Sequence, residues 1–397
     1  MDSRKPIGLG ASANPEAHPP GREASFPVSR SIASAAATWW VSHYYLRFVL
    51  RRALAALFLL WGMTLVAFTL TNVVPSDPVA AALGERLSQD PLAVQAFKQR
   101  YGLDQPLPQQ YLTYLVRLVH GDLGTSYVTG QNVFDDLSRY VPATFELGIA
   151  ALAIGLTIGT LIGLATGTRK GGWLDQVARL FSIATISAPL FWIAFLAVYL
   201  LSFKLSIFPS GGQLNAGSLP PPHVTGAYIV DALLAGDTGL AWEALQHVGL
   251  PATVLSLPII GLLSRFVRSA VIQVSSSDFV AAARAKGLPA RTVLIRYTLR
   301  AALSPIVTLF GLLFADVMTG AVLVEVSFSW PGVGLYAYRG AISLDIHVII
   351  GVALFVAVVY LATNLAVDLL YAWIDPRVRV SGMAGSKGRP VPGRVSQ

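Results

Sequence analysis

SDFVAAARAKGLPARTVLIRYTLRAALSP, residues 277–305, is a basic segment between two stretches that are apolar enough to cross a bilayer. It contains five Lys and Arg residues and a single acid, Asp278. Because a central arginine or lysine costs at least about 2.5 kcal/mol in hydrocarbon, the segment cannot span the membrane. Its alanine-rich start, Gly287 and Pro289 predict a short helix, a glycine break and a second basic helix. We expect a compact loop on the cytoplasmic face, either available for docking or an ordinary loop that follows the positive-inside rule.

The composition is that of a membrane protein. The 397 residues are 54% hydrophobic and only 13% charged, whereas a soluble domain carries about 25% charge. The apolar runs reach about 20 residues, which suits helical spans rather than barrel strands. The chain has no cysteine, which excludes disulfides, thiolate metal sites and cysteine nucleophiles. A net charge of +8 could indicate nucleic-acid binding, but arginine-rich cytoplasmic loops explain it, and we expect no nucleic acid as a partner.

Six apolar segments predict an all-α, multi-pass protein of the lipid bilayer with six transmembrane helices. They cover about residues 53–74, 143–167, 181–203, 250–263, 306–324 and 347–370. Pro189 falls near the middle of the third, where neighbouring helices can satisfy the carbonyl that it frees. An even number of spans puts both termini on one side. With the termini in the cytoplasm, 22 of the 29 Lys and Arg residues lie inside and 7 outside, as the positive-inside rule predicts.

Composition divides the chain into five parts. We expect a disordered cytoplasmic tail over 1–45, the first transmembrane helix over 46–74, an external segment over 75–141, a five-helix core over 142–380 and a cytoplasmic tail over 381–397. The cytoplasmic loop of the core covers 268–302. Helical spacing of apolar and polar residues predicts a short external helix at Gln109–Val119. A second short helix is expected around Tyr228–Leu234 in the next external loop.

Nothing in the chain indicates an enzyme, because no P-loop, histidine cluster or carboxylate pair has useful spacing. Asp316 lies deepest in a predicted span, where it could line a translocation path or make a hydrogen bond in helix packing. Glu325, just past the fifth span, is a second candidate for that path. Seven aromatic residues near predicted interfaces are expected to form an aromatic belt: Trp39, Trp40, Tyr44, Tyr45, Trp330, Tyr336 and Tyr338. Trp330-Pro331-Gly332 also predicts a tight turn or re-entrant element.

Four stretches together resemble the membrane-spanning permease subunit of bacterial ABC importers for dipeptides, oligopeptides and nickel. They are GLDQPLPQQYLTYLVRLVHGDLGTSY (102–127), DFVAAARAKGLPARTVLIRYTLRAALSPIVT (278–308), GAVLVEVSFSWPGVGLYAYRGAISLD (320–345) and NLAVDLLYAWIDPRVR (364–379). The resemblance covers the chain from about Arg47 to Val380. The long first external segment is similar to that of the B-type subunit more than to its shorter-looped C-type partner.

This resemblance implies the fold of a type I ABC importer transmembrane domain, with an EAA-x-x-x-G signature in the cytoplasmic loop. Gly287 matches the glycine, and Ala281 stands where the family has its acid, so a salt bridge from a glutamate to the ATPase is not available. Arg284 and Lys286 then become the expected polar contacts. The residues that the resemblance assigns to ATPase coupling are Asp278, Ala281, Ala282, Ala283, Arg284, Lys286 and Gly287.

The resemblance also implies partners in the bacterial inner membrane: a second homologous permease subunit in a heterodimer, two ABC ATPase subunits and an extracytoplasmic substrate-binding protein. The ATPase subunits would use ATP and Mg²⁺, and this chain would bind no cofactor itself. Dipeptides or oligopeptides are the expected cargo, with nickel chelates or glutathione as the alternative. A secondary transporter or channel that works without ATP would usually show inverted repeats, and none is visible between spans one to three and four to six. A membrane scaffold would need neither the Gly- and Thr-rich second span nor the long external segment.

Overall fold

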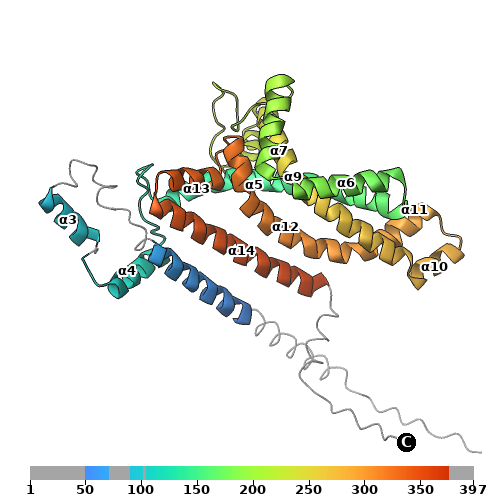
Figure 1. Ribbon diagram of the computed structural model, residues 1–397, viewed down its shortest axis with the longest axis horizontal. Helices are drawn as coiled ribbons and strands as arrows, with labels where there is room; N and C mark the ends of the chain where they lie inside the picture. Colours follow the sequence, from blue (N-terminus) through green and yellow to red (C-terminus); the bar gives the residue numbers. More distant parts are fainter. Residues whose placement is uncertain (1–49, 71–89, 102–103, 375–397) are drawn as a thin grey trace, which may run out of the picture. The chain divides into compact units, whose positions relative to one another are not determined.

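The computed structural model describes residues 50–70, 90–101 and 104–374 (Figure 1). Within these ranges the protein is helical, and its one β-type pairing is an isolated bridge between Thr125 and Asn132. The chain divides into two units, Met1–Leu54 and Ala55–Gln397, and the contacts given below lie within the second. The tails predicted over 1–45 and 381–397, and part of the predicted external segment, lie outside the described residues.

Four helices in the described ranges are long and apolar enough to cross a membrane, and a bent pair could form a fifth span. The four are Leu50–Leu70, α5 (Val133–Thr168), α9 (Thr238–Ser275) and the first part of α14 (Ile346–Ile374). The segment predicted as the fifth span lies in α12 (Arg300–Ser327). The all-helical membrane class is therefore confirmed, and the described part of each predicted span is helical except for a break in the third.

A groove of glycines on α5 receives side chains of α9. The four glycines lie on one face of α5, four residues apart, at positions 155, 159, 163 and 167. A methyl group on each would press in turn into Ile259, Leu263, Val267 and Val271 of α9. Small residues at this spacing let two helix backbones approach closely in a membrane bundle. The two helices therefore pack in one regular register, with steps of four residues on both sides.

The helix pair that contains the predicted third span is bent by 104°. α6 (Trp173–Ser187) ends at Ala188, and α7 (Leu190–Ala197) begins after Pro189 and continues as the π-helix η1 (Val198–Lys204). The expectation that Pro189 lies within a continuous span was wrong. A residue before proline is pushed out of the helical region, and Ala188 is extended with ψ at 134°. The neighbours therefore do not rescue the helix at this proline.

Both α5 and α9 are longer than the spans predicted inside them. α5 begins at Val133, where the side chain of Asn132 accepts a hydrogen bond from the N–H of Phe134 at 2.8 Å. The predicted domain boundary between residues 141 and 142 thus falls inside a helix, because Pro142 does not end it. α9 begins after Asp237, whose side chain caps it through the N–H of Leu240 at 2.9 Å. The apolar run marks the part in hydrocarbon, whereas the caps mark where the helix begins.

Shorter helices lie in the segments predicted to be external. They are α3 (Pro91–Tyr101), α4 (Leu107–Val119), α8 (Tyr228–Leu234) and α13 (Val333–Ile342). The helices predicted at Gln109–Val119 and Tyr228–Leu234 are confirmed. α4 lies against the first apolar helix, where the hydroxyl oxygens of Tyr111 and Thr64 are 2.9 Å apart.

Trp330-Pro331-Gly332 forms a turn between α12 and α13, as predicted. The expectation that Trp330 and Tyr336 belong to an aromatic belt was wrong, because the two residues are only 1% and 3% exposed. Tyr338 is 46% exposed, and the other four residues of the predicted belt lie outside the described ranges. The indole N–H of Trp330 donates to the carbonyl of Ala143 at 2.9 Å, and the hydroxyl of Tyr336 donates to Asp136 at 2.9 Å. Both polar tips have partners in the protein, so neither needs the membrane interface.

Candidate functional site

The basic loop forms a short helix between two long ones. α9 ends at Ser275, and α10 (Asp278–Ala285) begins after two intervening residues. After Gly287 and Leu288, Pro289 opens a helix that continues through α11 (Ala290–Thr292) and the π-helix η2 (Val293–Leu299) into α12. The predicted short helix, break and second helix are confirmed. The second helix is not separate, because it is the start of the helix that carries the predicted fifth span.

A Schellman motif ends α10 at Gly287. The N–H of Gly287 donates to the carbonyl of Arg284 at 2.9 Å, and the N–H of Leu288 donates to the carbonyl of Ala283 at 3.4 Å. Gly287 has a φ of +73°, a conformation that glycine adopts without the steric cost of a side chain. At the other end Asp278 lies in the first turn, where a negative charge favours the positive end of the helix dipole. The sequence therefore fixes both ends of α10.

One face of α10 is buried and the other is exposed. Val280 and Ala283 pack with Val293 of η2, and Val274 and Leu288 cover this small cluster. The exposed residues are Asp278, Phe279, Ala281, Ala282, Arg284, Ala285, Lys286 and Gly287. The buried cluster fixes the rotation of the short helix, so the exposed set forms a defined surface, which we call the α10 face.

The α10 face contains six of the seven residues predicted for coupling. The seventh, Ala283, points toward its own chain and is only 4% exposed, so it sets the packing of α10 and does not belong to the face. Phe279, which sequence reasoning missed, is 49% exposed and adds a large apolar group to the face. The sequence did hold a signal for the exposure of Phe279. The buried positions of α10, Val280 and Ala283, are three residues apart, and Phe279 does not follow this spacing.

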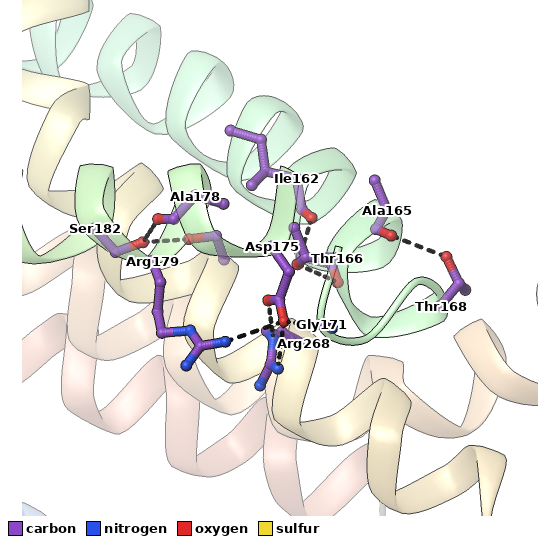
Figure 2. Close-up of polar contacts among 12 residues, drawn as sticks. Ile162, Ala165, Thr166, Thr168, Gly171, Asp175, Ala178, Arg179, Ser182 and Arg268 are labelled. Carbon is purple, nitrogen blue, oxygen red and sulfur yellow. Dashed lines mark hydrogen bonds and ion pairs between the residues drawn. The ribbon is translucent and has the colours of Figure 1, made fainter. Parts of the chain in front are cut away.

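A second polar cluster lies between α6 and α9 (Figure 2). Asp175, only 1% exposed, receives both Nε and Nη2 of Arg268, at 2.6 Å and 2.9 Å, on its two carboxylate oxygens. The N–H of Gly171 and the guanidinium of Arg179 donate to the second of these oxygens, at 3.1 Å and 3.2 Å. Sequence reasoning missed this cluster. Its one signal was a single acid among the basic residues of 169–180.

Glu325 is buried between helices. One carboxylate oxygen accepts a hydrogen bond from the hydroxyl of Thr144 in α5 at 2.7 Å. The other accepts from the N–H groups of Gly334 and Leu335, at 2.7 Å and 3.1 Å, in the first turn of α13. Glu325 therefore caps α13 and ties it to α5 and α12, and its oxygens are occupied by these donors.

Asp316 has a different environment from Glu325, although both lie on α12. It is exposed, and within the described part of the chain it makes no hydrogen bond or ion pair. Nine residues separate the two acids, which is about 13 Å along a helix. The structure therefore does not bring the two residues predicted for a substrate path into one site.

Residues 155–380 match the family model for the binding-protein-dependent transport system inner membrane component, and residues 45–148 match the model for the N-terminal part of such membrane components. The first match covers more than half of the chain. Together the two matches contain α5 to α14 except residues 149–154 of α5, and they include the α10 face and the polar cluster between α6 and α9.

Curated relatives are similar along nearly their whole length. The chain is 40% identical over 321 residues to the probable D,D-dipeptide transport system permease protein DdpB of Escherichia coli (strain K12), covering 81% of this chain and 94% of that protein. It is 37% identical over 335 residues to the di/tripeptide transport system permease protein DppB of Pseudomonas aeruginosa, and 33% identical over 334 residues to the dipeptide transport system permease protein DppB of Alkalihalophilus pseudofirmus. These two alignments each cover 84% of this chain and 99% of the relative.

The matches confirm the resemblance that the four sequence stretches carry, and they identify a translocation component rather than an enzyme. The chain therefore belongs to the family of binding-protein-dependent transport system inner membrane components.

Proposed function

We propose that this chain is the B-type permease subunit of an ATP-driven importer for dipeptides or oligopeptides, and that its α10 face docks on an ATPase subunit. The observation that carries the proposal is the construction of that face. Val280 and Ala283 anchor α10, the glycine turn ends it, and charged, apolar and small residues remain exposed together. An ordinary positive-inside loop needs charge but no fixed helical surface.

The face offers three kinds of contact to an ATPase groove. Arg284 and Lys286 supply positive charge, Phe279 supplies an apolar anchor, and Ala281 and Ala282 allow close backbone approach. Aromatic and arginine side chains are enriched among residues that dominate binding energy. Closure of two ATP-loaded ATPase subunits would move α10 as a rigid body and, through it, the helices on either side.

The remaining partners follow from the same proposal. A second homologous permease subunit forms the other half of the pathway, and a substrate-binding protein delivers cargo from outside. Both termini of this chain lie in the cytoplasm of the cell, in agreement with the distribution of Lys and Arg. ATP and Mg²⁺ bind to the ATPase subunits, and this chain holds no cofactor of its own.

Peptides are the favoured cargo because the relatives described above carry dipeptide or di/tripeptide transport in their names. Nickel chelates and glutathione are the alternative. The binding protein of the system decides between them, and mass spectrometry of the ligand that co-purifies with that protein identifies the cargo. An ATP-independent transporter or channel would instead move substrate in proteoliposomes that contain no nucleotide.

Ala282→Arg tests the docking surface directly, because it places a large charged side chain on the α10 face. We expect the variant to reach the membrane at the wild-type level but to lose most of the ATPase subunits on purification, with transport reduced about tenfold or more. Ala341→Arg is the matched control, since Ala341 is an exposed alanine on the external helix α13. If Ala282→Arg retains the ATPase subunits and full transport, α10 is not the docking element.

A further inference from the structure

Asp175 and Arg268 form a partly buried, bidentate ion pair rather than a solvent-exposed surface ion pair. The guanidinium donates through two nitrogens to the two oxygens of one carboxylate, which is the arrangement that gives an Arg–carboxylate pair its directional specificity. Asp175 is almost completely buried, and the backbone N–H of Gly171 donates to it as well. Figure 2 shows Arg268 reaching this carboxylate from α9, while Arg179 approaches from the same helix as Asp175.

The two arginines around Asp175 differ in their surroundings. The side chain of Arg268 is 27% exposed and that of Arg179 is 57% exposed. Arg179 follows Asp175 by four residues on α6, so its ion pair stays within one helix. Arg268 alone of the two connects α6 to another helix, and this makes Arg179 a natural internal control.

A second contact between α6 and α9 lies two turns further along α6. The hydroxyl oxygens of Ser182 and Ser264 are 3.1 Å apart. Gly261 of α9 lies so close to α6 that a methyl group on it would meet the side chain of Thr185. Two separated contacts prevent α6 from rotating on α9 about either one alone.

α9 connects these contacts to the α10 face. Arg268 lies seven residues before the end of α9, and only Ser276 and Ser277 separate α9 from α10. The N–H of Ser277 donates to the carbonyl of Val274 at 3.0 Å, which shortens the free length of this connection further. A displacement of α10 is therefore passed to α9, and whatever is tied to α9 moves with it.

We propose that Asp175 is a positioning residue that ties α6 to α9, so that α6 follows the movement of α10 during transport. The proposal deepens the proposed function, since it rests on the docking of α10 to an ATPase. The bent α6–α7 element then belongs to the moving body that includes α9. Without the tie, ATP hydrolysis would still move α10 and α9, but α6 would follow incompletely and transport per ATP would fall.

The first measurement is the number of ATP molecules hydrolysed per substrate transported, in proteoliposomes that contain the complete transporter. We expect Asp175→Asn to raise this ratio about three- to tenfold per assembled complex. Arg268→Lys should do the same, because an ammonium keeps the charge but not the two-pronged geometry. Arg179→Gln is expected to leave the ratio unchanged. If Asp175 only stabilised the fold, its loss would lower the amount of assembled complex. The number of ATP molecules hydrolysed per substrate transported would then stay at the wild-type value in the complexes that remain.

The second measurement is the distance between spin labels on α6 and α9. The chain has no cysteine of its own, so Val177→Cys and Gln273→Cys place labels at two exposed positions, after any cysteine of the partner subunits is replaced. In the otherwise unchanged chain we expect one narrow distance, equal in the nucleotide-free and ATP-trapped states. In Asp175→Asn the distance should broaden and differ between the two states.

The outcomes separate this inference from the proposed function. If Ala282→Arg keeps its ATPase subunits, the docking proposal fails, while the label distance still reports whether Asp175 holds α6 on α9. If docking holds but Asp175→Asn and Arg268→Lys both transport with the wild-type ratio, the inference is overturned. Should Asp175→Asn fail to accumulate, Arg268→Lys decides the question, since it retains a positive charge beside Asp175.

Discussion

The turn between α12 and α13 and the loop that carries α10 use charged residues in opposite ways. Glu325 and Asp345, on either side of α13, are both fully buried and accept hydrogen bonds from the N–H groups of helix N-termini. Asp278, Arg284 and Lys286 of α10 are all exposed. Both regions lie in sequence stretches that resemble the same permease family. The buried carboxylates beside α13 therefore hold parts of this chain together, whereas the charged residues of the α10 face are exposed.

Glu325→Ala should have the largest effect on stability, because it removes the carboxylate that joins α12, α13 and α5. The variant leaves the Thr144 hydroxyl and two backbone N–H groups of α13 without their acceptor. Buried donors without partners cost about 1–3 kcal/mol each, so we expect a loss of at least about 3 kcal/mol in stability. Thermal unfolding of the purified subunit in detergent measures it. Asp316→Ala, at an exposed acid of the same helix, should change the unfolding temperature little, and a similar drop in both would remove the special role of Glu325.

Asp345→Ala should have the next largest effect and should act locally. Asp345 accepts hydrogen bonds from the hydroxyl of Ser126 at 2.8 Å and from the N–H of Tyr127 at 2.6 Å, and it caps α14 through Val348. Losing these contacts should cost about 2 kcal/mol and free the loop of residues 124–131. Hydrogen exchange should show faster exchange there and no change at α10. Unchanged protection of the loop would mean that Asp345 does not hold it.

Gly287→Ala changes the turn at the end of α10, and we expect it to affect function more than stability. A non-glycine residue in the left-handed region costs about 1–2 kcal/mol, which one folded subunit tolerates. The altered turn would reorient α10, so we expect co-purification of the ATPase subunits to fall several-fold. Gly62→Ala is the control, because a methyl group there meets no atom within 4 Å. Full ATPase retention in Gly287→Ala would show that docking tolerates a changed turn.

The smallest effect concerns the pH dependence of the loop before α8. Burial alone would raise the pKa of Asp231, but hydrogen bonds from Thr225 and Gly226 outweigh it and hold the pKa below the ordinary value of 3.8. A carboxyl group whose pKa is lowered by folding stabilises the fold above its unfolded pKa and loses this contribution as the pH falls through the folded pKa. Protection of residues 223–231 in hydrogen exchange should therefore be constant from about pH 7 to pH 5 and decline only below about pH 4. In Asp231→Asn the hydrogen-exchange protection of this loop should be lower and nearly independent of pH.

Local signals in the sequence were sufficient for the elements whose ends are set by their own residues. α8 begins and ends where the apolar spacing predicts, and α10 ends at the glycine that can adopt a positive φ. The membrane class and the basic loop also follow from composition and charge. These features depend on backbone preference and on transfer from water to lipid, which a single sequence reveals.

Features that depend on a partner far away in the chain could not be predicted. Trp330 has the sequence features of an interface residue. In the structure its indole N–H donates to the carbonyl of Ala143, which lies 187 positions earlier in the chain. The sequence around Asp175 does not show that this acid pairs with Arg268 of α9. Pro189 is different, because its effect is local, but the sequence alone does not show whether neighbouring helices rescue a proline or let the span bend. The burial of Ala283 could not be predicted for a related reason, since the rotation of a short helix depends on what packs beneath it.

The glycine groove of α5 also limits how α5 and α9 can move past each other. The glycines of α5 and the large side chains of α9 that fill the groove repeat with the same four-residue period. A slide of 1 or 2 Å would drive Leu263 or Val267 onto the helix backbone between two glycines. A slide by a full period, about 6 Å, would bring every one of these α9 side chains except the last opposite a glycine again. The pair therefore has discrete positions instead of a continuous range, and any rearrangement between these two helices in transport must be a hinge motion or a whole step.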